Sequence, residues 1–203
     1  MSYSRWSNST WYTYWISMGP ADNEAPKEEQ RMAIHYSIED SITYQYSYDI
    51  DEFMELVEEE VAKMSAEGFN VEVANAESFQ LEDEFDIIVA GELIEHLSNP
   101  GKFLSNCYDH LSEDGIVIIT TPNPRRLQHL YWYLSGNESR INTEHTMWFD
   151  NQVFDELVSR HNFRIRQFHY YSPSVSLVSR PLFNLGLFQP LTSGGFTFVL
   201  EPK

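Results

Sequence analysis

Two short, almost entirely apolar segments constrain the fold of this chain most strongly. FDIIVA (residues 85–90) and GIVIIT (residues 115–120) have the length and composition of strands that are buried on both faces of a sheet. Between them, residues 99–111 show helical spacing of apolar positions, with Pro100 near the first turn. A strand, a helix and a second strand in this order predict two neighbouring parallel strands joined by a crossover.

The same alternation extends over most of the chain. We predict another strand at 70–74, helices at 51–67, 126–134 and 151–161, and closing strands at 163–171 and 196–200. The long loop at 172–195 favours an edge hairpin for the last two strands. From Asp51 on, the chain is therefore predicted to be an α/β unit with a mostly parallel sheet and an antiparallel last strand.

The first 48 residues have a different character. They are rich in aromatic residues, and segments 10–17, 31–36 and 42–48 are predicted to be three short strands without intervening helices. We therefore divide the chain into a strand-rich aromatic segment, 1–48, and an α/β part, 49–203.

Four sequence pieces follow one another in a familiar order: FDIIVAGELIEHLSNPGKFL, LSEDGIVIITTPNP, EHTMWFD and NFRI. Together they resemble the class I S-adenosylmethionine-dependent methyltransferases, in the broad group that modifies small molecules, glycans and lipids. The resemblance covers roughly residues 49–170. It implies a Rossmann-like methyltransferase sheet, S-adenosylmethionine as cofactor, and methyl transfer to an oxygen, or a less favoured nitrogen, of a small molecule or glycan.

The first motif of that family, a strand followed by a Gly-rich turn and a helix, is missing. Before Gly91 the chain has only Gly19 and Gly68, and neither lies between a strand and a helix. Three explanations stay open: an unrelated N-terminal module joined to a truncated domain, a rebuilt first unit, or another chain that completes the fold. We favour the first, in which the strand-rich segment replaces the first βαβ unit and covers the sheet edge. The missing turn also leaves open a non-catalytic, methyltransferase-derived domain that binds a partner.

The resemblance places the cofactor beyond the carboxyl ends of the strands. The residues expected to contact it are Asp49 or Asp51 at the ribose, Asn75, Ala76 and Glu77 near the adenine, and Ala90, Gly91 and Glu92 after the next strand. Each of these groups has a purely structural alternative: a helix N-cap, a solvated turn, or a strand-to-helix turn.

Glu95, His96 and His145 are the candidate catalytic residues, because methyl transfer to a hydroxyl requires a group that accepts its proton. Together with Glu92 they also resemble the metal-ligand set of small-RNA 2′-O-methyltransferases, so a metal-dependent RNA enzyme is a less favoured alternative. The favoured interpretation includes no metal. A third interpretation gives these side chains only helix-capping and loop-bonding roles.

Charge narrows the choice of partners. The formal net charge is −18, with 31 acidic against 13 basic residues, and this field repels phosphates. It disfavours nucleic acid as a partner and also fits a halophilic host. No apolar run approaches the roughly 20 residues of a membrane helix, and the start of the chain lacks the apolar segment of a secretory signal, so we expect a cytoplasmic protein. The single cysteine, Cys107, excludes an internal disulfide.

Overall fold

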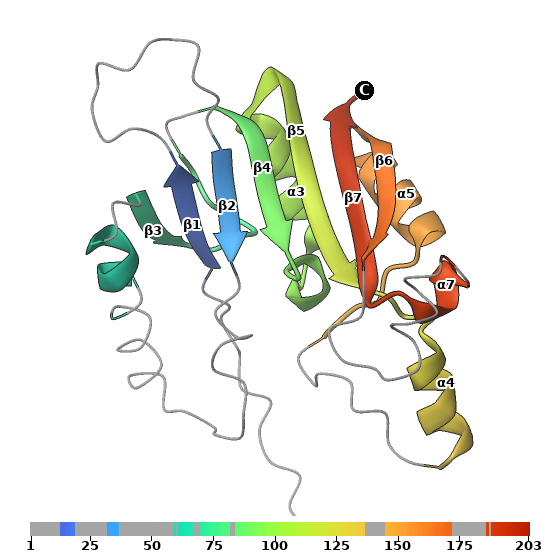
Figure 1. Ribbon diagram of the computed structural model, residues 1–203. Coiled ribbons are helices and arrows are strands. Elements are labelled where there is room, and N and C mark those ends of the chain that lie inside the picture. Colours follow the sequence, from blue (N-terminus) through green and yellow to red (C-terminus); the bar gives the residue numbers. More distant parts are fainter. Residues whose placement is uncertain are drawn as a thin grey trace, which may run out of the picture.

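A computed structural model describes the protein at residues 13–18, 32–36, 59, 61–66, 70–81, 84–136, 145–171, 186 and 188–203. Within these residues, seven strands form one sheet in the order β3-β1-β2-β4-β5-β7-β6 (Figure 1). Their bounds are β1 Thr13–Met18, β2 Met32–Tyr36, β3 Asn70–Ala74, β4 Phe85–Gly91, β5 Leu111–Pro122, β6 Phe163–Tyr171 and β7 Gly195–Pro202. The α/β sheet expected from the sequence is confirmed.

The centre of the sheet is the parallel pair β4 and β5. Ala90 pairs with Ile119 and Gly91 with Thr120, so the two strands end at the same edge. Ile88, Ala90 and Ile119 are completely buried, as their apolar sequence predicts. β7 runs antiparallel to β5, and β6 runs antiparallel to β7 at the sheet's edge, which confirms the closing hairpin.

The N-terminal segment completes the other half of the sheet. β2 lies parallel to β4, from Met32 opposite Ile87 to Tyr36 opposite Gly91, and so covers the edge that the missing first unit would have left exposed. β1 runs antiparallel to both β2 and β3 and lies between them. The third strand expected in this segment, at 42–48, lies outside the described residues. The division at residues 48 and 49 stays a prediction, although one sheet takes strands from both parts.

The sheet is more mixed than the sequence indicated. Of the six strand pairings described, two are parallel, β2 with β4 and β4 with β5. The difference arises because β1 enters antiparallel to both of its neighbours. The expected alternation of strands and helices began only at Asp51, after the residues that form β1 and β2.

Helices α3 (Pro100–Asp109) and α5 (Asn151–Arg160) pack against one face of the sheet (Figure 1). Phe103 of α3 and Phe154 of α5 have no exposed surface, and Phe154 stacks on Phe198 of β7 with ring centroids 4.0 Å apart. Three shorter helices connect the strands. The helix η1 (Ile94–His96) follows β4, α4 (Leu127–Leu134) follows β5, and α7 (Gln189–Thr192) precedes β7. Among the described residues, no helix is both long and apolar enough to cross a bilayer.

The ends of α3 and α5 follow from local sequence. The Asn99 side chain caps α3 by accepting a hydrogen bond from the Lys102 amide, and Pro100 occupies the first helical position, where no amide donor is needed. Asp150 caps α5 by accepting hydrogen bonds from the amides of Gln152, at 2.9 Å, and Val153, at 3.0 Å.

Removing the cap of α5 should give a pH-dependent loss of stability. The hydrogen bond from the Val153 amide, followed by that from Arg125, lowers the pKa of Asp150. Asp150→Ala should lower the free energy of unfolding by about 1 kcal/mol at neutral pH. Because the pKa is lower in the folded state than in the unfolded state, this stabilisation is complete above the unfolded pKa and is lost as the pH falls through the folded pKa.

Urea unfolding of both proteins at neutral pH and near pH 3 measures this effect, and the difference should shrink in acid. Asp150→Asn is the control, since an amide oxygen also caps a helix while the ion pair with Arg125 is removed. A penalty for Asp150→Ala that is the same at both pH values would contradict the role of the ionised carboxylate.

Candidate functional site

The carboxyl ends of β2, β4 and β5 lie together at one edge of the sheet. Tyr36, Gly91 and Thr120 are paired across these three strands, so the segments that follow them leave the sheet side by side. This is the edge at which open α/β sheets bind ligands.

Glu92 begins the turn after β4 in an unusual backbone conformation. Its φ angle is 50°, which is costly for a residue with a side chain. Its amide donates to the carbonyl oxygen of Thr120, at 3.1 Å, and to the Thr120 hydroxyl, at 3.0 Å. Its carboxylate accepts a hydrogen bond from the Tyr171 hydroxyl at 2.9 Å. These three hydrogen bonds hold a strained residue at the strand end where a cofactor contact was expected.

Gly91, directly before it, is not required by packing. A Cβ atom built there would lie 3.7 Å from the Thr120 hydroxyl oxygen, an ordinary contact distance. The protein itself therefore does not demand glycine at this position, which leaves room for the close approach of a ligand.

The turn after β3 uses its polar side chains within the protein. The Asn75 side-chain oxygen accepts a hydrogen bond from the Glu77 amide at 2.8 Å. The Glu77 carboxylate accepts one from the Asn99 amide at 2.7 Å, which ties this turn to the start of α3. Ala76 is 2% exposed and packs in the core. These contacts are those of the structural alternative for this turn, while Asp49 and Asp51 lie outside the described residues.

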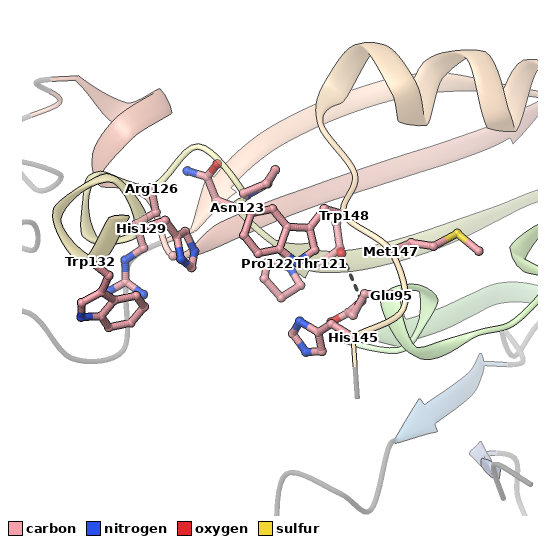
Figure 2. Close-up of a pocket in the computed structure, with 12 residues that line it drawn as sticks. Glu95, Thr121, Pro122, Asn123, Arg126, His129, Trp132, His145, Met147 and Trp148 are labelled. Carbon is pink, nitrogen blue, oxygen red and sulfur yellow. Dashed lines mark hydrogen bonds between the residues drawn. The ribbon is translucent and has the colours of Figure 1, made fainter. Parts of the chain in front are cut away.

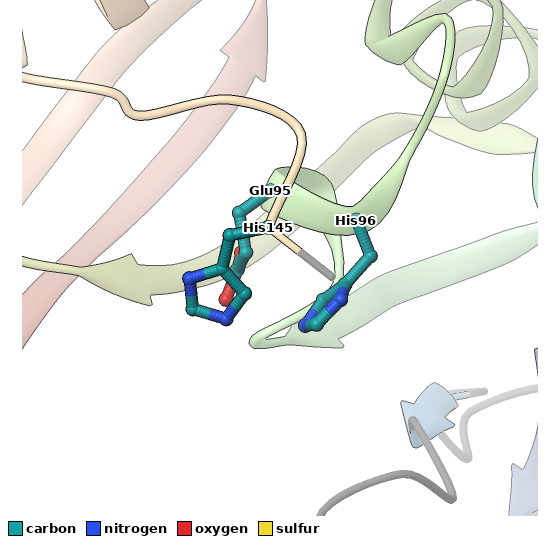
Figure 3. A group of neighbouring side chains, drawn as sticks. All are labelled: Glu95, His96 and His145. Atoms are coloured by element: carbon teal, nitrogen blue, oxygen red, sulfur yellow. The ribbon is translucent and has the colours of Figure 1, made fainter. Parts of the chain in front are cut away.

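Glu95, His96 and His145 come together, as their candidate roles require (Figure 3). Glu95 and His96 form the short helix η1, and both are buried. One potential ligand atom from each of the three residues lies within 4.8 Å of those of the other two. The rings of His96 and His145 meet edge to face with centroids 4.7 Å apart.

Backbone hydrogen bonds explain why residues 50 positions apart in sequence meet here. The amides of Thr146 and Met147 both donate to the carbonyl oxygen of Glu95, at 2.8 and 3.2 Å. The Thr146 hydroxyl donates to the same oxygen at 3.0 Å and to the Leu97 carbonyl oxygen at 2.9 Å. The segment before α5 is thereby fastened to η1, which fixes the position of His145.

The polar residues Glu92, Glu95, His96 and His145 divide into two sets. The Glu95 carboxylate accepts a hydrogen bond from the Thr121 hydroxyl of β5, at 3.0 Å. The Glu92 carboxylate is bonded by Tyr171 of β6 and does not belong to the cluster with His96 and His145. Three of the four residues that resemble a metal-ligand set in the less favoured alternative therefore lie together.

A cavity of about 150 Å³ opens beside this cluster (Figure 2). Its walls come from η1, from the end of β5 and the residues that follow it, from α4, from the segment before α5 and from the residue before β7. The lining residues are Glu95, Thr121, Pro122, Asn123, Pro124, Arg126, His129, Trp132, His145, Met147, Trp148 and Gly194.

Sequence reasoning missed the part of this cavity built by α4. His129 and Trp132 are three residues apart and lie on one face of α4, and Arg126 is the residue directly before the helix. That spacing, directly after the strand exit TTPNP, was the available signal. Burial lowers the pKa of Arg126. Burial, followed by the positive charge of Arg126, lowers the pKa of His129.

Asn123 supports the wall of the cavity. It is fully buried, and its amide nitrogen donates to the Pro190 carbonyl oxygen at 3.0 Å and to the Ser193 hydroxyl at 2.8 Å. Its side-chain oxygen accepts from the Arg125 amide at 2.9 Å. Asn123 therefore joins the end of β5 to α7 and to the start of α4. Trp148 lines the cavity and is 43% exposed.

Comparison with known proteins identifies the family. Residues 20–167, well over half of the chain, match the family model described as a methyltransferase domain. A ubiquinone biosynthesis O-methyltransferase of Rickettsia prowazekii (strain Madrid E) is 29% identical over 84 residues, which are 40% of this chain and 33% of that protein. The enzyme of the same name from Glaesserella parasuis serovar 5 (strain SH0165) is 42% identical over 41 residues, 20% of this chain and 17% of that protein. The matched region thus spans a third or less of each curated relative.

Among solved structures, the chain is similar to a SAM-dependent methyltransferase from Archaeoglobus fulgidus, with a TM-score of 0.49 and 18% identity over 74% of this chain and 80% of that one. The family match agrees with the class I fold and with S-adenosylmethionine as cofactor, both expected from the sequence. The chain belongs to the methyltransferase-domain family of S-adenosylmethionine-dependent enzymes.

Proposed function

We propose that this protein transfers a methyl group from S-adenosylmethionine to an oxygen of a small molecule or glycan, with His145 accepting the proton of the acceptor hydroxyl. The observation that carries the proposal is the meeting of Glu95, His96 and His145 beside a cavity at the carboxyl ends of β4 and β5. Both curated relatives are named O-methyltransferases, which favours oxygen over nitrogen as the acceptor atom.

The residues around Gly91 fit a bound cofactor. Gly91 leaves room at the strand end, and Glu92 is held in a strained conformation there. When bound, S-adenosylmethionine supplies an electrophilic methyl group. The chain's own contribution is to orient the acceptor in the cavity and to take up its proton.

His145 suits the role of proton acceptor because the cavity reaches it while η1 fixes its segment. The Glu95 carboxylate, oriented by Thr121, stabilises the imidazolium that forms when a neighbouring histidine takes a proton. His96 packs edge to face against His145 and helps to fix the plane of its ring. We propose that Glu95 and His96 act together with His145 in taking up the proton of the acceptor.

Calorimetric titration with S-adenosylhomocysteine tests whether the chain retains the cofactor site without the Gly-rich turn. We expect dissociation in the micromolar range, roughly −8 kcal/mol. Gly91→Val should abolish it, because a branched side chain would occupy the space above the strand end. Val153→Ala, at an exposed position of α5 away from this strand end, serves as the control.

If the folded protein, in the same salt, gives no binding heat with S-adenosylhomocysteine at millimolar concentration, the enzymatic proposal is contradicted. This result would favour the alternative raised by the missing turn, a non-catalytic, methyltransferase-derived domain that binds a partner. Circular dichroism in the same buffer establishes that the protein is folded.

A second candidate function is metal-dependent 2′-O-methylation of RNA, because Glu95, His96 and His145 offer a carboxylate and two imidazoles within 4.8 Å. A cation there would engage the histidine that the first candidate uses as a base. Metal-free protein should therefore keep its activity under the first candidate and lose it under the second. The net charge of −18 disfavours an RNA substrate.

A further inference from the structure

We infer that the methyl acceptor is a compound with one aromatic ring, a hydroxyl group at one end and an anionic substituent, such as a carboxylate, at the other. This inference rests on the proposed function, because it names the acceptor class for the same cavity. It is carried by the size of the cavity, by the opposite charges at its two ends, and by the rings along its walls.

The volume of the cavity fits a single ring. About 150 Å³ is the size of an engineered protein cavity that takes up benzene, so a substituted benzene fills such a space and a fused polycyclic compound exceeds it. The cavity is not sealed, since Trp148 on its rim is 43% exposed, and a small substituent can reach out of it.

The two ends of the cavity differ in charge. Figure 2 shows Arg126, with His129 and Trp132, on one side, and Glu95 with His145 on the other. Glu95 and Arg126 are the carboxylate and the guanidinium among the lining residues. An anionic group is attracted to the Arg126 end and repelled from the Glu95 end, so an acceptor with one anionic substituent binds in one orientation.

That orientation places the hydroxyl where the proposed chemistry requires it. With the anionic group at Arg126, the opposite end of the ring points toward Glu95 and His145. His145 is the proposed proton acceptor, and η1 directly follows the strand end at Gly91 and Glu92 where the cofactor is expected. Charge at one end thereby aligns the reacting group at the other.

Flat groups line the Arg126 end and the stretch between the two ends. The rings of His129 and Trp148 lie with centroids 5.1 Å apart, and those of His129 and Trp132 lie 5.6 Å apart. Pro122 and Pro124 contribute further apolar surface without amide donors. Such walls favour an aromatic ring over a polyhydroxylated sugar, which would need many hydrogen-bonding partners.

Arg126 is distinguished from its neighbour Arg125. Arg125 is not among the residues that line the cavity and pairs with Asp150 at 2.7 Å, with about half of its side chain exposed. Arg126 lines the cavity and is partly buried there, and this burial lowers its pKa. A desolvated guanidinium interacts more strongly with an anion than an exposed one does, even in a chain whose net charge is −18.

The test uses hydroxybenzoates, with the hydroxyl in each ring position, and the matching hydroxybenzamides, which are neutral and similar in shape. Binding is followed by calorimetry and by tryptophan fluorescence, in the absence of S-adenosylmethionine. At least one hydroxybenzoate should bind about tenfold or more tightly than its amide, the range expected for a charge-assisted hydrogen bond. Arg126→Met should remove this preference, and Arg126→Lys should retain part of it.

Arg125→Met is the matched control and should leave the preference unchanged. The inference is overturned if no hydroxybenzoate binds, if acid and amide bind equally, or if Arg126→Met keeps the preference. Arg126→Lys preserves the charge, so it keeps the test decisive if Arg126→Met does not fold. If the protein binds S-adenosylhomocysteine but not the hydroxybenzoates, the proposed function stands and this acceptor class is wrong. If it binds the hydroxybenzoates but not S-adenosylhomocysteine, the binding site stands and the methyltransferase proposal is wrong.

Discussion

His145→Ala should lower the rate of methyl transfer by about 10²- to 10⁴-fold, the contribution typical of a positioned general base. His145 lines the cavity and lies beside Glu95 and His96, so its loss removes the proposed proton acceptor. Affinity for S-adenosylhomocysteine should change little, because the strand end at Gly91 is untouched. The measurement is transfer of a radiolabelled methyl group from S-adenosylmethionine to the best hydroxybenzoate acceptor.

A pH profile separates a chemical role from a structural one. In the parent protein, kcat/KM should rise with pH as a single base loses its proton, and His145→Ala should lack this limb. His169→Ala, at an exposed histidine of β6, is the matched control and should retain parent activity. Activity within about threefold of the parent in His145→Ala, with an unchanged pH profile, would rule out the base.

Phe154→Ala should lower the free energy of unfolding by about 3–5 kcal/mol, the range for truncating a buried phenylalanine. Phe154 has no exposed surface, stacks on Phe198 at 4.0 Å and meets Phe149 edge to face at 5.8 Å. It anchors α5 to the sheet, and the segment before α5 carries His145. Urea unfolding followed by circular dichroism measures the loss.

Val153→Ala on the same helix is the control, because that side chain is 53% exposed and its truncation should cost little. A loss below about 1 kcal/mol for Phe154→Ala would mean that α5 does not pack on β7 as described. Since α5 and His145 are joined through residues 146–150, weakened packing should also reduce the methyl-transfer rate.

Local pattern was enough to predict most elements from residue 70 onward. β3 and β6 have the predicted bounds, and β4, α3, α4 and α5 differ from prediction by one or two residues at an end. β5 is longer than predicted and begins at Leu111, because Leu111 pairs with Phe85 ahead of an irregularity in the register between Phe85 and Ile87. Apolar periodicity decides which residues face a core, whereas pairing with a neighbouring strand decides where a strand begins.

In the N-terminal half of the sheet, the local sequence pattern predicted strands but not how those strands pair. Two of the strands expected there were confirmed, but their composition carried no information on which strands they would join. β2 adds to β4 in parallel, and β1 lies antiparallel between β2 and β3. Pairing over long sequence distances depends on which edges are free once the rest of the sheet has formed.

The sequence alone determined the family, the central parallel strands and the candidates Glu95, His96 and His145, because buried strands and their polar exits leave a local signature. Only the tertiary structure decided that these three side chains meet, that Glu92 joins Tyr171 instead, and that Arg126 faces them across one cavity. The physical reason is that such contacts join residues far apart in the chain. They are fixed by backbone hydrogen bonds, such as those of Thr146 and Met147 to Glu95, which no periodicity encodes.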